Sequence, residues 1–121
     1  MMKKLEIGTK TLKQMGEDVL EAWKATEAGQ SVKPRQALNF ANMPQLLTAL
    51  TPTRWAMLEA LKACGPTTLY ALAKQLERNY SNVHSDAAKL LALGLIEKNA
   101  SGKVFVPWDE IHADFTLKAA A

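Results

Sequence analysis

The chain has 121 residues, enough for one domain with a modest core or for a small domain with an added arm. Apolar residues make up 48% and charged residues 22%, an ordinary balance for a globular protein that argues against disorder. The net charge of +3 is by itself only a weak indication of a nucleic-acid partner.

No apolar run approaches the roughly 20 residues that a helix needs to cross a bilayer. Charged residues such as Glu6, Lys10 and Lys13 interrupt the start of the chain, so it lacks the apolar core of a secretion signal. We therefore expect a cytoplasmic protein. Cys64 is the single cysteine, which excludes an internal disulfide, and we expect it to pack as a small apolar residue.

Residues 1–50 are predicted to form an N-terminal arm. Residues 3–8 alternate between polar and apolar, which is typical of a short strand. Thr9 or Thr11 can cap the helix that follows, and Gly16 within its apolar stripe indicates close approach by another chain segment. That stripe consists of Leu12, Met15, Val19, Leu20 and Trp23.

The arm continues through a loop near residues 28–34 to a possible second strand at residues 36–40. Asn42 then caps a brief helix that reaches Leu50, with Pro44 tolerated in its first turn.

A stronger helix start follows at Thr51, because Pro52 occupies the first helical position, where its missing N–H is not needed. Leu50 and Trp55 are spaced as a hydrophobic staple, and Gly65 ends the helix. The predicted buried face comprises Met57, Leu58, Leu61 and Cys64.

Two further helices and a hairpin complete this region. Thr67 or Thr68 caps a helix of about ten residues, and Asn79 caps the next, which Gly94 ends. Residues 99–102 form a turn between two short strands, the second spanning residues 103–107. The buried faces of the two helices are expected to be Leu69, Leu72, Ala73 and Leu76, and Tyr80, Val83, Ala87, Leu90 and Leu91.

This order of elements predicts an α+β fold, mainly α with a small β part: a winged helix-turn-helix with an N-terminal strand–helix extension. We place the arm at residues 1–50 as a dimerisation segment, the DNA-binding domain at residues 51–108 and a tail at residues 109–121. The central domain has seven Lys or Arg against four acids, whereas the tail has three acids and one lysine.

The third helix of this domain has a small, polar outer face. With Val83 as the inward reference and about 100° per residue, Ser85 points outward between Ser81 and Lys89, and Asp86 lies to the side. Ser and Asn can hydrogen-bond base edges, and lysines neutralise phosphates. The predicted DNA contacts are Thr68, Lys74, Arg78, Asn79, Tyr80, Ser81, Asn82, His84, Ser85, Lys89, Ser101 and Lys103. The alternative is that this face is only solvated surface.

Several segments resemble a family of small prokaryotic regulators with a MarR-like winged helix. They are Leu50-Thr51-Pro52 with Leu58 and Leu61, Asn82-Val83-His84 with Asp86, Leu93-Gly94-Leu95-Ile96-Glu97, and Val106-Pro107-Trp108-Asp109-Glu110-Ile111. The resemblance implies a sequence-specific transcriptional regulator, and some similar proteins look like the antitoxin half of a toxin–antitoxin pair. Ser81 and Ser85 depart from the basic residues expected in many relatives, so phosphate attraction is expected to be weaker and dimerisation more important.

No enzyme is expected from this sequence. His84 and His112 lack metal-ligand neighbours, and no glycine-rich phosphate loop is present, so neither a metal nor a cofactor is predicted. Trp23, Trp55 and Trp108 are interpreted as core or interface residues.

Two functions therefore compete. The first is a dimeric repressor that reads double-stranded DNA with the helix at residues 80–93, each copy binding one half-site. The second is an antitoxin-type protein whose winged helix, acidic tail or both bind a toxin-like partner and which also regulates its own operon. The alternating residues 111–117 fit a strand that adds to another sheet, and pairing within the homodimer is the favoured form.

Overall fold

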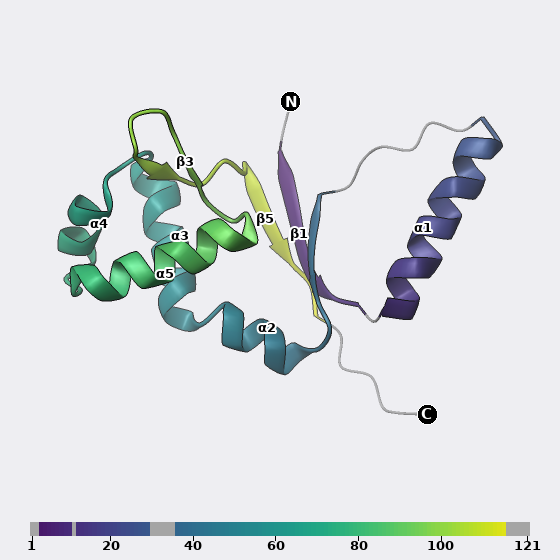
Figure 1. Ribbon diagram of the computed structural model, residues 1–121, viewed down its shortest axis with the longest axis horizontal. Helices are drawn as coiled ribbons and strands as arrows, with labels where there is room; N and C mark the ends of the chain where they lie inside the picture. The colour runs from purple at the N-terminus through teal and green to yellow at the C-terminus, as the bar shows by residue number, and fades with distance from the viewer. Residues whose placement is uncertain (1–2, 11, 30–35, 116–121) are drawn as a thin grey trace. The chain divides into compact units, whose positions relative to one another are not determined.

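A computed structural model describes residues 3–10, 12–29 and 36–115 of the chain (Figure 1). Within these residues five helices and five strands form a mixed α/β structure, which confirms the α+β prediction at this level. None of the described helices combines the length and apolar character needed to cross a membrane. The elements are β1 (Lys4–Thr9), α1 (Leu12–Glu27), β2 (Ala37–Phe40), α2 (Met43–Ala49), α3 (Pro52–Cys64), α4 (Leu69–Leu76), α5 (Tyr80–Leu93), β3 (Glu97–Lys98), β4 (Val104–Phe105) and β5 (Glu110–Ala113).

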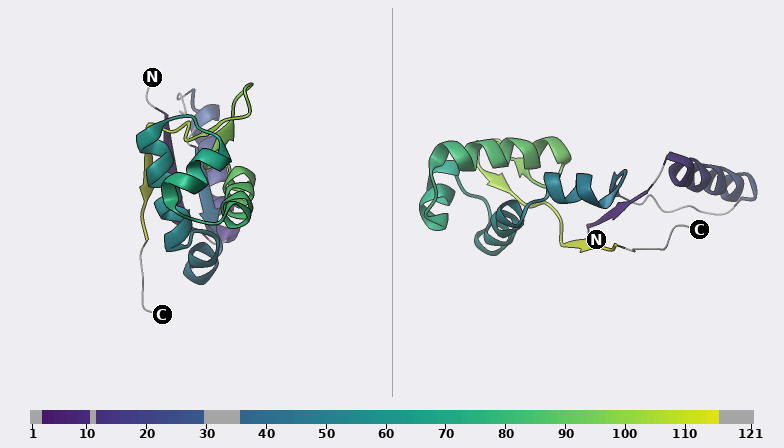
Figure 2. Two further views of the ribbon diagram at one scale, coloured as in Figure 1. Left: turned by 90° about the vertical axis from the view of Figure 1, so that its left-hand side faces the viewer. Right: turned by 90° about the horizontal axis from the view of Figure 1, so that it is seen from below.

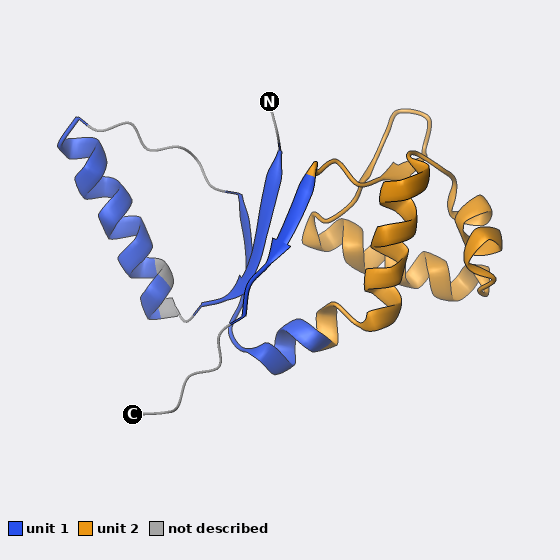
Figure 3. Ribbon diagram, turned by 180° about the vertical axis from the view of Figure 1, so that it is seen from behind, with its two compact units in different colours: residues 1–47, 110–121 blue, residues 48–109 orange. Residues whose placement is uncertain are grey.

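The chain divides into two compact units (Figure 3). Unit 1 contains Met1–Leu47 together with Glu110–Ala121, and unit 2 is the continuous segment Thr48–Asp109. Unit 2 covers the segment for which a DNA-binding domain is predicted, and unit 1 combines the predicted arm with the predicted tail.

Unit 1 is organised around a parallel sheet with the strand order β2-β1-β5 (Figures 1 and 2). The register places Leu5 beside Ile111 and Ile7 beside both Leu38 and Ala113. Since paired residues share a face of a sheet, one face is apolar, and Leu5 and Ile7 are both buried on it. The predicted strands near residues 3–8 and 36–40 are thus confirmed as β1 and β2.

The tail strand has a partner within its own chain. Residues 110–113 pair with β1 of the same molecule, whereas the sequence favoured pairing between two copies of the tail. The sequence did not predict this pairing, because β1 and β5 lie far apart in the chain. The alternation in the tail indicates a strand but not the strand beside it. Residues 116–121 lie outside the described part of the chain.

Helix α1 forms as predicted, but its apolar stripe is not buried. Val19, Leu20 and Trp23 are 68%, 54% and 65% exposed. Trp23 is therefore not a core residue in this chain, because its ring is left open to solvent. Thr11, as a candidate cap, and residues 30–35 of the predicted loop lie outside the described residues, as do the side chains of Leu12 and Met15.

The two helices that follow begin as predicted. The Asn42 side chain accepts a hydrogen bond from the Gln45 N–H at 2.9 Å, ahead of α2. Thr51 caps α3 by accepting from the Arg54 N–H at 3.2 Å, and Gly65 ends that helix with φ 77°. Cys64 does not pack into the core as predicted: it is exposed, because it lies in the last turn beyond the buried face.

Helices α4 and α5 are joined by a short turn. Thr68, not Thr67, caps α4 by accepting from the Ala71 N–H at 3.1 Å. Thr67 instead exchanges two backbone hydrogen bonds with Val104, which adds it to the edge of the hairpin. Glu77 ends α4 in a left-handed conformation with φ 54°.

Helix α5 starts at the predicted cap, where the Asn79 side chain accepts from the Ser81 N–H at 2.8 Å, and it ends at Gly94 with φ 79°. The hairpin β3–β4 is antiparallel, and its returning strand is shorter than the five residues predicted. The buried residues of unit 2 are Leu50, Met57, Leu58, Leu61, Leu72, Ala73, Val83, Ala87, Leu90, Leu95, Ile96, Val104 and Trp108.

Candidate nucleic-acid interface

The outer face of α5 is open to solvent along its length. Val83, Ala87 and Leu90 are fully buried on the opposite side, so the helical rotation leaves the predicted contact residues outside. The exposed members of the predicted set on and before α5 are Asn79, Tyr80, Ser81, Asn82, His84, Ser85 and Lys89. Tyr80 was also predicted to line the inner face; at 48% exposure it does not, because the first turn of the helix extends beyond the core.

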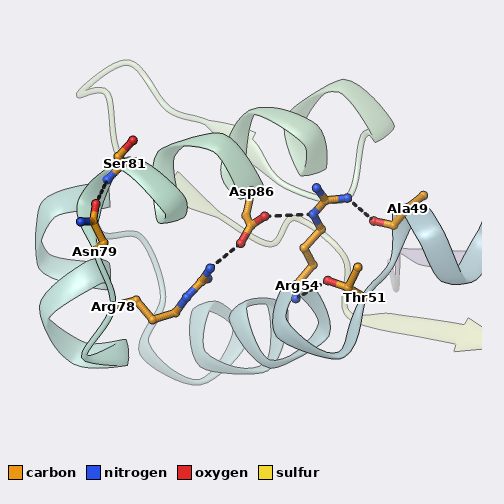
Figure 4. A network of polar contacts seen from close by, with 7 residues as sticks. All are labelled: Ala49, Thr51, Arg54, Arg78, Asn79, Ser81 and Asp86. Carbon is orange, nitrogen blue, oxygen red and sulfur yellow. Dashed lines mark hydrogen bonds and ion pairs between the residues drawn. The ribbon is translucent and has the colours of Figure 1, made fainter.

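An ion cluster holds α5 against α3 from the inner side (Figure 4). The Asp86 carboxylate accepts from Arg54 Nε at 3.1 Å and from Arg78 Nη2 at 2.8 Å. Arg54 Nη1 also donates to the Ala49 carbonyl at 2.7 Å. Three segments, at the end of α2, the start of α3 and the turn before α5, are thereby fixed to one carboxylate in the middle of α5.

The cluster is largely shielded from water. The side chains of Arg54 and Asp86 are each 16% exposed and that of Arg78 is 25% exposed. Burial acts to raise the pKa of Asp86, but the hydrogen bonds from Arg78 and Arg54 outweigh it and hold that pKa below its ordinary value of 3.8. Asp86 is therefore ionised at neutral pH and bridges two cations.

This geometry gives Arg78 a different role from the one predicted for it. The sequence placed its guanidinium where a DNA backbone passes, whereas the structure turns the group inward to Asp86. The ion pair was not predicted, because Asp86 was only placed at the side of α5; a DNA contact by Arg78 stays a prediction. Its second partner, Arg54, is 32 residues away in sequence, and no local pattern indicates that pair.

Aromatic and basic side chains lie together on α4 and at the start of α5. Lys74 Nζ lies 4.7 Å from the ring centroid of Tyr70, which is 61% exposed. The rings of Tyr80 and His84 are 5.9 Å apart. Sequence reasoning missed Tyr70, although its spacing of four residues from Lys74 on one helix predicts such a contact.

The β3–β4 turn carries two more of the predicted contacts, Ser101 and Lys103. The Asn99 side chain accepts from the backbone N–H groups of Ser101 and Lys103, both at 3.0 Å. Gly102 has φ 79°, so the turn uses a glycine where other residues are strained. The turn projects from the helices (Figure 2), and the side chains of Ser101 and Lys103 are exposed on it.

The arrangement offers hydrogen-bonding groups and positive charge. Hydroxyl and amide groups on α5 can donate or accept, and Lys74, Lys89 and Lys103 supply cations from three elements. Thr68 is exposed at the start of α4, although its hydroxyl is already used as the cap. Within the described part of the chain, no group of three or more His, Cys, Asp or Glu side chains could hold a metal ion.

Residues 49–113 match the HVO_A0114 family. The match covers more than half of the chain, from the end of α2 through β5, and the chain therefore belongs to this family. No curated protein and no solved structure matches the chain.

Proposed function

We propose that this protein is a sequence-specific, DNA-binding transcriptional regulator with a MarR-like winged helix-turn-helix in residues 51–108. In this proposal α4 and α5 are the helix-turn-helix, the β3–β4 hairpin is the wing, and α5 enters the major groove. The protein acts in the cytoplasm as a homodimeric repressor, with one α5 for each half-site. It is not an enzyme and needs no cofactor.

One observation carries the proposal: α5 has a rigidly held inner side and an exposed outer side made of small polar residues. The buried apolar residues and the Asp86 cluster fix the rotation of α5 about its axis. Ser81, Asn82 and Ser85 are short enough to let a helix backbone approach base edges closely. A side chain that reads a base must be held in one position, which is what this anchoring provides.

The proposal is tested by a gel-shift titration with the DNA upstream of the protein's own gene. Random DNA of the same length and base composition, at physiological salt, is the control. We expect the upstream DNA to bind at least about a thousandfold more tightly, the lower end of typical specific recognition. Equal affinity for both DNAs would contradict the specific-regulator proposal.

The antitoxin-type function remains a second proposal, and the position of β5 favours it. β5 is an edge strand of the three-stranded sheet, so its outer side can accept a strand from another protein. Expression with the product of the neighbouring gene, followed by purification through a tag on that product, tests this. Recovery of the neighbour alone would count against it.

A further inference from the structure

Helix α1 presents large apolar side chains that are open to solvent. Among the described side chains of α1, those of Val19, Leu20 and Trp23 are large, apolar and exposed. At about 100° per residue they fall within one stripe about 100° wide, and Gly16 lies inside the same stripe. An exposed apolar stripe of this kind on a helix is typical of an interface.

Gly16 makes this face complementary in shape to itself. Gly16 has no side chain, and a Cβ built on it would meet no described atom within 4 Å, so another helix can approach the backbone closely there; we call this position the notch. In an antiparallel helix pair whose two-fold axis passes between Val19 and Leu20, Trp23 of each copy lies opposite Gly16 of the other. A parallel pair would instead set Trp23 against Trp23 and the two notches against each other.

The charges beside the stripe favour the same orientation. Glu17 and Lys24 lie on the same flank of the stripe, seven residues apart. Helical side chains lean toward the N-terminus of their own helix, which in the antiparallel pair brings Glu17 of each copy to Lys24 of the other. In the parallel pair, the flank that carries Glu17 and Lys24 faces the opposite flank of the other helix, so this charge pair does not form.

We infer that α1 is the surface on which a second copy of this chain docks, antiparallel, with each Trp23 in the notch at the other copy's Gly16. This inference rests on the proposed function only in that it supplies the dimer which the repressor requires. The occupant is a second copy because both the shape and the charge pattern of α1 complement α1 itself.

Gly16→Leu tests the inference because it acts in opposite directions on the helix and on the pair. Leucine favours a helix more than glycine does, and the space around Gly16 is open, so α1 gains helicity within one chain. The same side chain fills the notch that Trp23 of the other copy occupies. We expect the dimer dissociation constant, measured by sedimentation equilibrium of the full chain, to rise about tenfold to a hundredfold.

Gln14→Leu is the matched control, since it introduces the same residue at an exposed position on the opposite side of α1. This variant is expected to remain as dimeric as the parent chain. Circular dichroism should show that neither variant loses helix. A monomeric parent chain at about 100 μM, or a Gly16→Leu variant that is as dimeric as the parent, would overturn the inference.

Charge reversal tests the orientation. Glu17→Lys and Lys24→Glu should each weaken the homodimer, and the double variant Glu17→Lys/Lys24→Glu should restore it, because opposite charges then face each other again. Failure of the double variant to recover would exclude the antiparallel pair. The two proposals can be told apart. A monomer that still selects its upstream DNA would contradict the α1 dimer and the homodimeric form of the regulator, but not specific DNA binding. An α1 dimer without DNA preference would contradict the regulator alone.

Discussion

Asp86 is the residue on which the position of α5 depends most. Its carboxylate is a partner for two guanidinium groups that come from different elements, and little water reaches any of them. Removing the charge would leave two poorly solvated cations close together, which costs more than losing a surface ion pair. Arg54 and Arg78 thus act on the candidate interface through Asp86.

We expect Asp86→Asn to lower the free energy of unfolding at pH 7 by about 1–3 kcal/mol. The folded-state pKa of Asp86 lies below 3.8, so folding favours the ionised form. Its contribution is complete above that value and is lost as pH falls through the folded-state pKa. Urea titrations from pH 7 to pH 2 should show the parent and the variant converging at acid pH; Glu59→Gln, at an exposed carboxylate of α3, is the control.

Glu77 is strained for a different reason, because a residue with a Cβ occupies the left-handed region at φ 54°. We expect Glu77→Gly to raise the free energy of unfolding, measured by urea titration, by about 0.5–1 kcal/mol, since glycine adopts this conformation without a steric penalty. Glu77→Ala retains the Cβ and removes the charge, so it should give no such gain. Equal stabilisation by both variants would assign the effect to charge.

At the scale of the element, α5 combines residues that are expected to serve different purposes. Asn82 can contact a base edge, whereas Lys89 carries a charge suited to phosphate. The cap at Asn79 and the left-handed Gly94 fix where the helix begins and ends. If α5 lies in the major groove, a substitution of Asn82 should change which DNA sequence is preferred. A substitution of Lys89 should change the affinity for any DNA sequence.

We expect Asn82→Ala to reduce the preference for upstream over random DNA by about fivefold to a hundredfold. Lys89→Ala should weaken binding to both DNAs alike. For each half-site, it should also reduce the slope of log affinity against log salt by about one. Competition gel shifts at several salt concentrations separate the two effects. Gln45→Ala, an exposed amide on α2, serves as the control for Asn82.

The elements that local chemistry specifies were the ones predictable from the sequence. Thr51 with Pro52, Asn79 and Gly94 set helix boundaries through groups only a few residues apart, and the structure confirms all of them. The Arg54–Asp86 pair and the pairing of β5 with β1 join distant positions, which periodicity does not encode.

Burial was predictable only where a stripe has a covering partner in the same chain. The pattern on α5 gave its buried side correctly at Val83, Ala87 and Leu90, whereas the equally clear pattern on α1 gave a stripe that is exposed. An amphipathic sequence indicates that a face prefers to be covered, but it does not say which molecule covers it.

At the scale of the whole molecule, the modest charge limits how tightly one copy can hold DNA. The net charge is +3, and the candidate interface contributes Lys74, Lys89 and Lys103. If all three lysines contact phosphate, a dimer should show a slope of log affinity against log salt of about −5. The Gly16→Leu variant, expected to bind as a monomer, should show about half of that slope; an unchanged slope would mean that the dimer is not needed for binding.

The pairing of β1 with β5 also has a consequence for how the chain acquires its structure during synthesis. β1 is synthesised roughly a hundred residues before β5. Ile111 and Ala113, the neighbours of Leu5 and Ile7, are therefore still missing when unit 2, a continuous segment, has been synthesised. Closing so long a loop is entropically costly, and the sheet of unit 1 is therefore the last part expected to form. A nascent chain arrested before residue 110 would carry one unpaired edge of β1, which is a place for a chaperone to bind.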